Sequence, residues 1–184
     1  MGELDLEQAL AAACRGEEWG VNLLFRALQP QLLRYLGQHA PRREQDLASE
    51  TWLAVAERLA SFEGSLSDFR ALVFTIARRR LVDHYRQEGR RLRPLPMEQE
   101  AEVADPEQGP EGVVEVLSAR EAVAALVGSL PPAQAEVLLL RVVADLGVEE
   151  VAAVMGRSAA AVRVLQHRAL RQLAKRFAGE GVTK

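Results

Sequence analysis

Cysteine is nearly absent from this sequence: Cys14 is the single one among 184 residues. One cysteine excludes an intrachain disulfide, and a redox sensor would need a resolving partner that the chain lacks. The three histidines, His39, His84 and His167, are too far apart to be paired at metal-ligand spacing, so we expect no metal site. The sequence also offers no phosphate-binding loop and no nucleophile elbow. These absences predict a protein without a catalytic site and without a cofactor.

Long apolar runs are absent as well. No stretch approaches the roughly 18 residues that a membrane-spanning helix needs, and the first residues, Met1-Gly2-Glu3-Leu4-Asp5, lack the basic start of a signal peptide. We therefore expect a cytoplasmic protein with no membrane insertion. Aromatic residues make up only 5%, whereas apolar residues make up 48%, which suffices for a packed core. The abundance of Ala, Leu, Val, Arg and Glu favours helix over sheet.

The net charge of −3 hides an uneven distribution of charge along the chain. Residues 69–93 carry eight arginines against two acids, and residues 156–176 carry six cations and no acid. Between them, residues 94–117 carry seven acids and no cation, with several prolines and glycines, a composition that resists packing. We predict an all-α protein in which two small helical domains, 1–93 and 118–184, are joined by this flexible acidic linker.

Apolar residues recur at helical spacing in both predicted domains. In the N-terminal one, residues 63–67 interrupt the pattern before a long helix that begins at Asp68 or Phe69, apolar in its first half and basic in its second. In the C-terminal one, a capping box at Ser118 opens the first helix, and Pro131-Pro132 suits the first turn of the next. The predicted helices cover residues 21–39, 46–61, about 68–91, 118–127, 132–144, 148–155 and 159–177.

The last two predicted helices form a helix-turn-helix. Gly156 suits the left-handed position that closes helix 148–155, and Ser158 caps helix 159–177. At about 100° per residue, one side of the last helix is apolar and can pack on the domain core; it holds Val162, Leu165, Ala169 and Leu173. The remaining surface suits the DNA major groove and its phosphates, with candidate contacts Ser158, Ala160, Arg163, Val164, His167, Arg168 and Arg171. A solvated basic face on an ordinary three-helix bundle is the alternative.

The basic half of the long helix is a second candidate nucleic-acid surface. Arg79, Asp83, Arg86 and Arg90 are spaced so that they share one stripe of the helix. A loop with small polar residues precedes this helix. Arginines on such a stripe can hold phosphates, although a solvated charged face would have the same pattern.

Three stretches resemble the extracytoplasmic-function group of bacterial RNA polymerase sigma factors. Residues 69–86 look like that family's promoter-melting helix, and residues 46–52 look like its core-polymerase-binding helix. Residues 130–169 are similar to its fourth conserved region. The similar parts cover residues 20–93 and 115–177, with the acidic linker between them. The chain departs from residues frequent in the family at Ser49, Leu72, Arg79 and Ala161.

The resemblance implies a sigma factor that binds core RNA polymerase and directs promoter recognition, DNA melting and transcription initiation. Its implied partners are core RNA polymerase, promoter DNA and, where one exists, an anti-sigma factor. The implied contacts with the −10 element are Ser65, Ser67, Arg78, Arg79, Asp83, Arg86 and Arg90. The implied contacts with core polymerase lie on a polar helix face bearing Asp46, Ser49, Glu50 and Glu57. The helix-turn-helix residues named above would contact the −35 element.

A self-sufficient helix-turn-helix transcriptional regulator, with an N-terminal sensing or dimerisation domain, is the competing hypothesis. It explains residues 118–177 equally well. It does not explain the second basic helix at 69–91.

Overall fold

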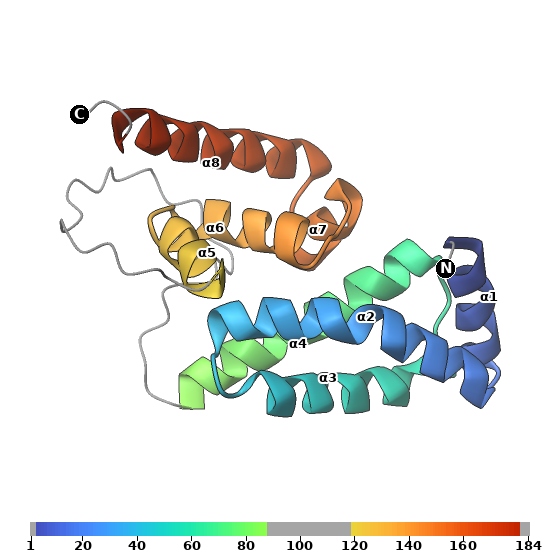
Figure 1. Cartoon of the computed structure of the whole chain (residues 1–184). Helices are drawn as coiled ribbons and strands as arrows, with labels where there is room; N and C mark the ends of the chain where they lie inside the picture. Colours follow the sequence, from blue (N-terminus) through green and yellow to red (C-terminus); the bar gives the residue numbers. More distant parts are fainter. Residues whose placement is uncertain (1–2, 88–118, 181–184) are drawn as a thin grey trace.

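The computed structural model describes residues 3–87 and 119–180, and the side chains of residues 5–87 and 123–177. Within them every regular element is a helix, which confirms the predicted all-α class (Figure 1). The elements are α1 (Glu3–Cys14), α2 (Glu18–His39), α3 (Glu44–Leu59), α4 (Leu66–Gln87), α5 (Ala119–Gly128), α6 (Pro132–Leu138), the π-helical turn η1 (Leu139–Val143), α7 (Val148–Met155) and α8 (Ala159–Glu180). Among these helices, none combines the length and the apolar character that crossing a bilayer requires. The acidic segment 94–117, Arg90 and Ser118 lie outside the described residues.

The long basic helix begins earlier than the sequence analysis predicted. α4 starts at Leu66 and not at Asp68 or Phe69, because Ser65 and Asp68 form a reciprocal capping pair. The Asp68 backbone N–H donates to Ser65 Oγ over 3.2 Å, and the Ser65 N–H donates to Asp68 Oδ2 over 2.9 Å. The hydrogen bonds from Ser65 also hold the pKa of Asp68 below its ordinary value.

The helix predicted to run to about Ala144 changes its winding before it ends. α6 stops at Leu138, and the chain continues through the wider turn η1, in which the Ala144 N–H donates to the Leu139 carbonyl over 3.0 Å. The two turn predictions that follow are confirmed. Gly156 closes α7 with φ 63°, and Ser158 Oγ accepts a hydrogen bond from the Ala161 N–H over 3.2 Å.

The first helix, α1, packs across α2 at short range. The sequence analysis placed its first helix at residue 21 and did not resolve α1. A Cβ added at Gly20 of α2 would lie 2.4 Å from the Ala9 carbonyl oxygen and 2.7 Å from the Ala13 nitrogen. The close crossing of the two helices therefore requires glycine at position 20.

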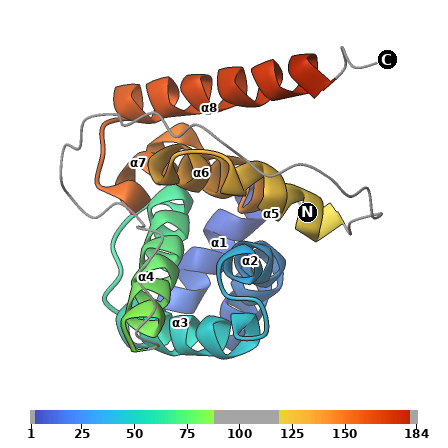
Figure 2. The same ribbon diagram turned by 90° about the vertical axis from the view of Figure 1, so that its left-hand side faces the viewer.

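The C-terminal helices α6, η1 and α7 pack directly on α2 and α4 of the N-terminal helices (Figures 1 and 2). One continuous core of buried side chains connects the two groups, from Leu24 and Phe74 in the N-terminal helices to Val137 and Leu140 in the C-terminal ones. α8 lies on the far side of α6 and α7, away from α1–α4 (Figure 2). This arrangement leaves one long face of α8 uncovered by the rest of the described chain.

Candidate functional site

The structure divides α8 into a packed side and an exposed side, as the helical periodicity predicted. Val162 and Ala169 are buried, and Leu165 and Leu173 are half-buried against the other C-terminal helices. The candidate contacts within the helix all lie on the exposed part of its surface: Ala160, Arg163, Val164, His167, Arg168 and Arg171. Ser158, which caps the helix, is exposed as well. The fold thus presents the seven predicted residues together on one accessible surface.

Arg163 has an acidic neighbour on the preceding helix. Its Nη2 lies 2.9 Å from Glu149 Oε1 of α7, and both side chains are largely exposed. An exposed ion pair of this kind contributes only about 0–1 kcal/mol. The guanidinium is therefore held loosely, and a phosphate or a base edge can replace the carboxylate at little cost.

The candidate −10 residues on the loop before α4 and on α4 itself are only partly brought together. Ser65 is exposed on the loop, and Ser67 and Arg79 are exposed on α4. Arg86 is also exposed, and its Nη1 lies 3.7 Å from Asp83 Oδ1. Arg78 is different, because it is only 8% exposed and faces the C-terminal helices.

Arg78 belongs to a buried polar cluster around Glu136 of α6, which is 1% exposed. Tyr35 Oη donates a hydrogen bond to Glu136 Oε1 over 2.7 Å. His39 Nε2 lies 3.3 Å from Glu136 Oε2, and Arg78 Nε lies 3.5 Å from Oε1. Burial opposes ionisation of this carboxyl, but His39, the Tyr35 hydroxyl and Arg78 together lower the pKa of Glu136. Burial and the adjacent carboxylate raise the pKa of Tyr35.

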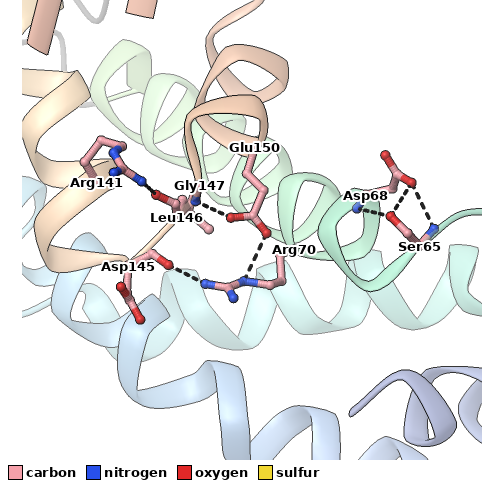
Figure 3. A network of polar contacts seen from close by, with 8 residues as sticks. All are labelled: Ser65, Asp68, Arg70, Arg141, Asp145, Leu146, Gly147 and Glu150. Carbon is pink, nitrogen blue, oxygen red and sulfur yellow. Dashed lines mark hydrogen bonds and ion pairs between the residues drawn. The ribbon is translucent and has the colours of Figure 1, made fainter. Parts of the chain in front are cut away.

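A second polar contact connects α4 with the C-terminal helices (Figure 3). Arg70 Nε lies 3.3 Å from Glu150 Oε1 of α7, and Arg70 Nη2 donates to the Asp145 carbonyl. The other carboxylate oxygen of Glu150 accepts a hydrogen bond from the Gly147 N–H at the start of α7. Sequence reasoning missed Arg70, Glu136 and Glu150 as a group. Glu136 did carry a signal for such a cluster, because it is the lone acid within an apolar helical segment.

The candidate polymerase-binding residues Asp46, Ser49, Glu50 and Glu57 are all exposed on α3. Three of them pair with arginines: Arg43 Nε lies 3.3 Å from Asp46 Oδ2, Arg80 Nε lies 4.0 Å from Glu50 Oε2, and Arg58 Nη1 lies 3.8 Å from Glu57 Oε2. Between them projects Leu53, which is 69% exposed. Sequence analysis did not single out Leu53, because a single exposed apolar residue is common on protein surfaces; the groove beside it sets this one apart.

An apolar groove adjoins this face of α3, where α3 packs on α2. It has a volume of about 440 Å³ and includes Val21, Phe25, Trp52 and Leu53 in its lining. The rings of Phe25 and Trp52 lie 5.2 Å apart, and Trp52 Nε1 donates to Gln29 Oε1 over 2.7 Å, which fixes the indole in the groove. The surface of α3 is therefore apolar in its middle and acidic at its edges.

Comparisons with known proteins match both the N-terminal and the C-terminal helices. The family model of sigma-70 region 2 matches residues 24–91, and that of sigma-70 region 4 matches residues 120–173. The ECF RNA polymerase sigma factor SigD of Mycobacterium tuberculosis is 31% identical over 182 residues, covering 96% of this chain and 85% of SigD. The region 2 match therefore contains α3, α4 and the loop between them, and the region 4 match contains α7 and most of α8.

Solved structures with the same fold were also found. CnrH, in complex with the cytosolic domain of CnrY, is similar with a TM-score of 0.68 and 21% identity, covering 94% of this chain and 97% of CnrH. The sigma factor RpoE of Bartonella quintana, in complex with the anti-sigma factor NepR, is similar with a TM-score of 0.61 and 20% identity, covering 89% and 98%. At these identities the two structures establish a shared fold.

Proposed function

The chain belongs to the extracytoplasmic-function sigma factors of RNA polymerase, and from this membership we propose which of its surfaces performs each step of initiation. Its function is that of a sigma factor: it binds core RNA polymerase and directs promoter recognition and transcription initiation. The observation that carries the assignment is the presence of both sigma regions in the family's order along the chain. We assign residues 1–93 to core polymerase and the −10 element, 94–117 to a linker, and 118–184 to the −35 element.

The exposed side of α8 is the proposed −35 reader. An α-helix fits the major groove of B-DNA, where arginine side chains can pair with guanine through two hydrogen bonds. Arg163 and Arg171 are exposed on this side and are the proposed base readers, while His167 and Arg168 assist them. Support comes from the burial of the opposite side of α8, which fixes the direction in which these side chains project.

The loop before α4 and the basic half of α4 are the proposed −10 surface. Opening a duplex without ATP requires that flipped bases be captured, which offsets an unstacking cost of a few kcal/mol per step. Ser65 lies exposed on the loop and Ser67 lies exposed in the first turn of α4. Arg79 and Arg86 lie exposed farther along the same helix. In this proposal the loop accepts a base while the arginines hold phosphates of the melted strand.

Three further assignments complete the proposal. The chain acts in the cytoplasm, where the polymerase works, and it contributes no catalytic site of its own to the polymerase. An anti-sigma factor is a proposed regulator, and support comes from RpoE, whose structure contains the anti-sigma factor NepR. A self-sufficient regulator would instead bind operator duplex tightly without polymerase.

Binding to core polymerase is tested by co-purification. We expect the wild-type chain to be retained by immobilised core polymerase. Asp46→Lys combined with Glu50→Lys should weaken retention about tenfold or more, because it places two cations on the proposed polymerase face of α3. Glu7→Lys combined with Glu149→Lys, which makes the same change of charge on exposed sites of α1 and α7, is the control and should be retained like the wild type. Equal retention of all three proteins would refute the placement of the contact on α3.

A further inference from the structure

We propose that a polar pocket between α3 and α4 is a binding site for a phosphate group, held by the guanidinium groups of Arg43 and Arg80. The group belongs either to the backbone of single-stranded DNA or to a small compound such as pyrophosphate, and the chemistry that recognises it is the same. Neither arginine has a role in the surfaces assigned above. The phosphate site does not depend on those assignments, whereas its effect on polymerase binding rests on the function proposed above.

The pocket lies where the start of α3 approaches the second half of α4. It has a volume of about 300 Å³, and both segments contribute charged or ionisable side chains to its lining. Three arginines against two carboxylates leave a net charge of +1 there, in a chain whose overall net charge is −3. The pocket is therefore a local positive concavity. These side chains are Arg43, Glu50, Arg80, Asp83, His84 and Arg86.

The turn that carries Arg43 is fixed relative to α4. The Tyr85 hydroxyl of α4 donates a hydrogen bond to the His39 carbonyl, at the end of α2 just before this turn. Within the turn, the Arg43 N–H donates to the Ala40 carbonyl over 3.1 Å. Arg42 has φ 76°, a left-handed conformation that is uncommon for residues other than glycine. The arginines of the pocket thus come from two segments that the fold holds together.

The carboxylates near these arginines hold them only loosely. Arg43 Nε lies 3.3 Å from Asp46 Oδ2, and both side chains are at least half exposed. Arg80 Nε lies 4.0 Å from Glu50 Oε2, with 39% and 48% of these side chains exposed. Strong hydrogen bonds between an arginine and a carboxylate measure about 2.7–2.9 Å, and exposed pairs at longer distances contribute little. A phosphate oxygen can therefore replace either carboxylate.

A phosphate group fits this pocket in charge, shape and size. The planar guanidinium fork binds phosphate oxygens through two hydrogen bonds at once. A tetrahedral phosphate directs its oxygens in several directions, so one group can contact Arg43 and Arg80 from opposite walls. The volume of about 300 Å³ also leaves room for bound waters, each of which takes about 30 Å³ in the liquid. The positive lining disfavours a metal cation.

Occupation of the pocket has a consequence for the neighbouring surface of α3. A phosphate bound to Arg80 displaces the carboxylate of Glu50, which is one of the residues assigned to the polymerase contact. Asp83 and Arg86, which are assigned to the −10 surface, line the same pocket. In this proposal phosphate binding beside the −10 surface frees an acidic group for core polymerase.

Titration calorimetry of the full-length chain with pyrophosphate at low salt tests the site. We expect the wild type to bind, and we expect Arg43→Gln and Arg80→Gln each to weaken binding about tenfold, because each removes hydrogen bonds to a charged group. Arg58→Gln is the matched control. Arg58 is exposed on α3 and lies 3.8 Å from Glu57, outside the pocket, so its replacement changes the net charge equally. It should bind pyrophosphate within about twofold of the wild type.

The salt dependence of DNA binding identifies the source of the phosphate. Labelled single-stranded DNA of mixed sequence is titrated with each full-length protein at several salt concentrations. Each DNA phosphate that the protein neutralises contributes about 0.7 to the slope of log K against log salt. If the pocket holds a DNA phosphate, the slope decreases by about this amount in Arg43→Gln and Arg80→Gln but not in Arg58→Gln. Lost pyrophosphate affinity with an unchanged slope would identify a small phosphate compound as the occupant.

The proposal is overturned if both pocket variants, shown to be folded by circular dichroism, keep the pyrophosphate affinity and the salt slope of the wild type. Equal losses in Arg58→Gln would also overturn it, because they would reflect net charge alone. Retention on core polymerase is measured in parallel. Retained variants without any phosphate effect leave the assigned function intact and remove the phosphate site. A wild-type chain that is not retained contradicts the function, while the pyrophosphate titration still decides the site.

Discussion

Replacement of Leu53 by aspartate is expected to weaken the binding of core RNA polymerase about a hundredfold or more. Leu53 is 69% exposed in the centre of the acidic face of α3, beside the apolar groove between α2 and α3. Burial of a leucine side chain contributes about 1.5–3 kcal/mol, and an unpaired carboxylate in the same contact adds a further desolvation cost. A loss of about 2.7 kcal/mol corresponds to a hundredfold change in Kd.

The fold itself should tolerate Leu53→Asp, because exposed positions change stability by only about 0.5 kcal/mol. Phe177→Asp is the matched control: Phe177 is 56% exposed near the end of α8. α8 lies on the other side of α6 and α7 from α3 (Figure 1). Affinity is measured by titration of labelled protein with core polymerase. If Leu53→Asp binds as tightly as the control, the polymerase contact lies on another face of the chain.

Replacement of Arg163 and Arg171 together by alanine is expected to reduce transcription from a −35-dependent promoter about a hundredfold. Each base-directed arginine contributes about 1–3 kcal/mol of discrimination, and losses at separate base pairs add roughly, as expected for two arginines eight positions apart on one helix. Single-turnover run-off transcription with the holoenzyme measures the loss. A change of sequence preference would mark base reading, whereas a uniform loss would mark phosphate binding.

Glu149→Gln provides the opposing control for Arg163. It removes the carboxylate that lies 2.9 Å from the Arg163 guanidinium and leaves every side chain of α8 unchanged. We expect promoter binding to be unchanged or up to a few-fold tighter, since a surface ion pair contributes at most about 1 kcal/mol. Wild-type transcription by the double arginine variant would show that the recognition surface of α8 has been placed wrongly.

The sequence predicted the surfaces that depend on local structure. The apolar side of α8 follows from helical periodicity, and burial of Val162 and Ala169 agrees with it. Gly156 and Ser158 mark the turn between α7 and α8, because each type of residue satisfies one defined backbone requirement. The start of α4 was misplaced, since Ser65 and Asp68 had not been recognised as a capping pair.

The sequence did not predict the contact between the N-terminal and C-terminal helices. Arg78 and Glu136 are far apart along the chain. Helical periodicity shows which side of a helix is buried, but it does not show which other helix covers that side. Arg78 lies in a run of three arginines that charge alone does not distinguish. The packing of α6 separates them, burying Arg78 while Arg79 stays exposed.

Run-off transcription with the host's core polymerase on fragments of host genomic DNA tests the assignment as a sigma factor most directly. The account predicts discrete transcripts that appear only when this chain is added, with start sites that follow a shared pair of −35 and −10 elements. Loss of these transcripts with Leu53→Asp, but not with Phe177→Asp, would connect them to the surface on α3. Tight, sequence-specific binding of duplex DNA by the chain alone, without transcripts from added polymerase, would contradict the account and favour a self-sufficient regulator.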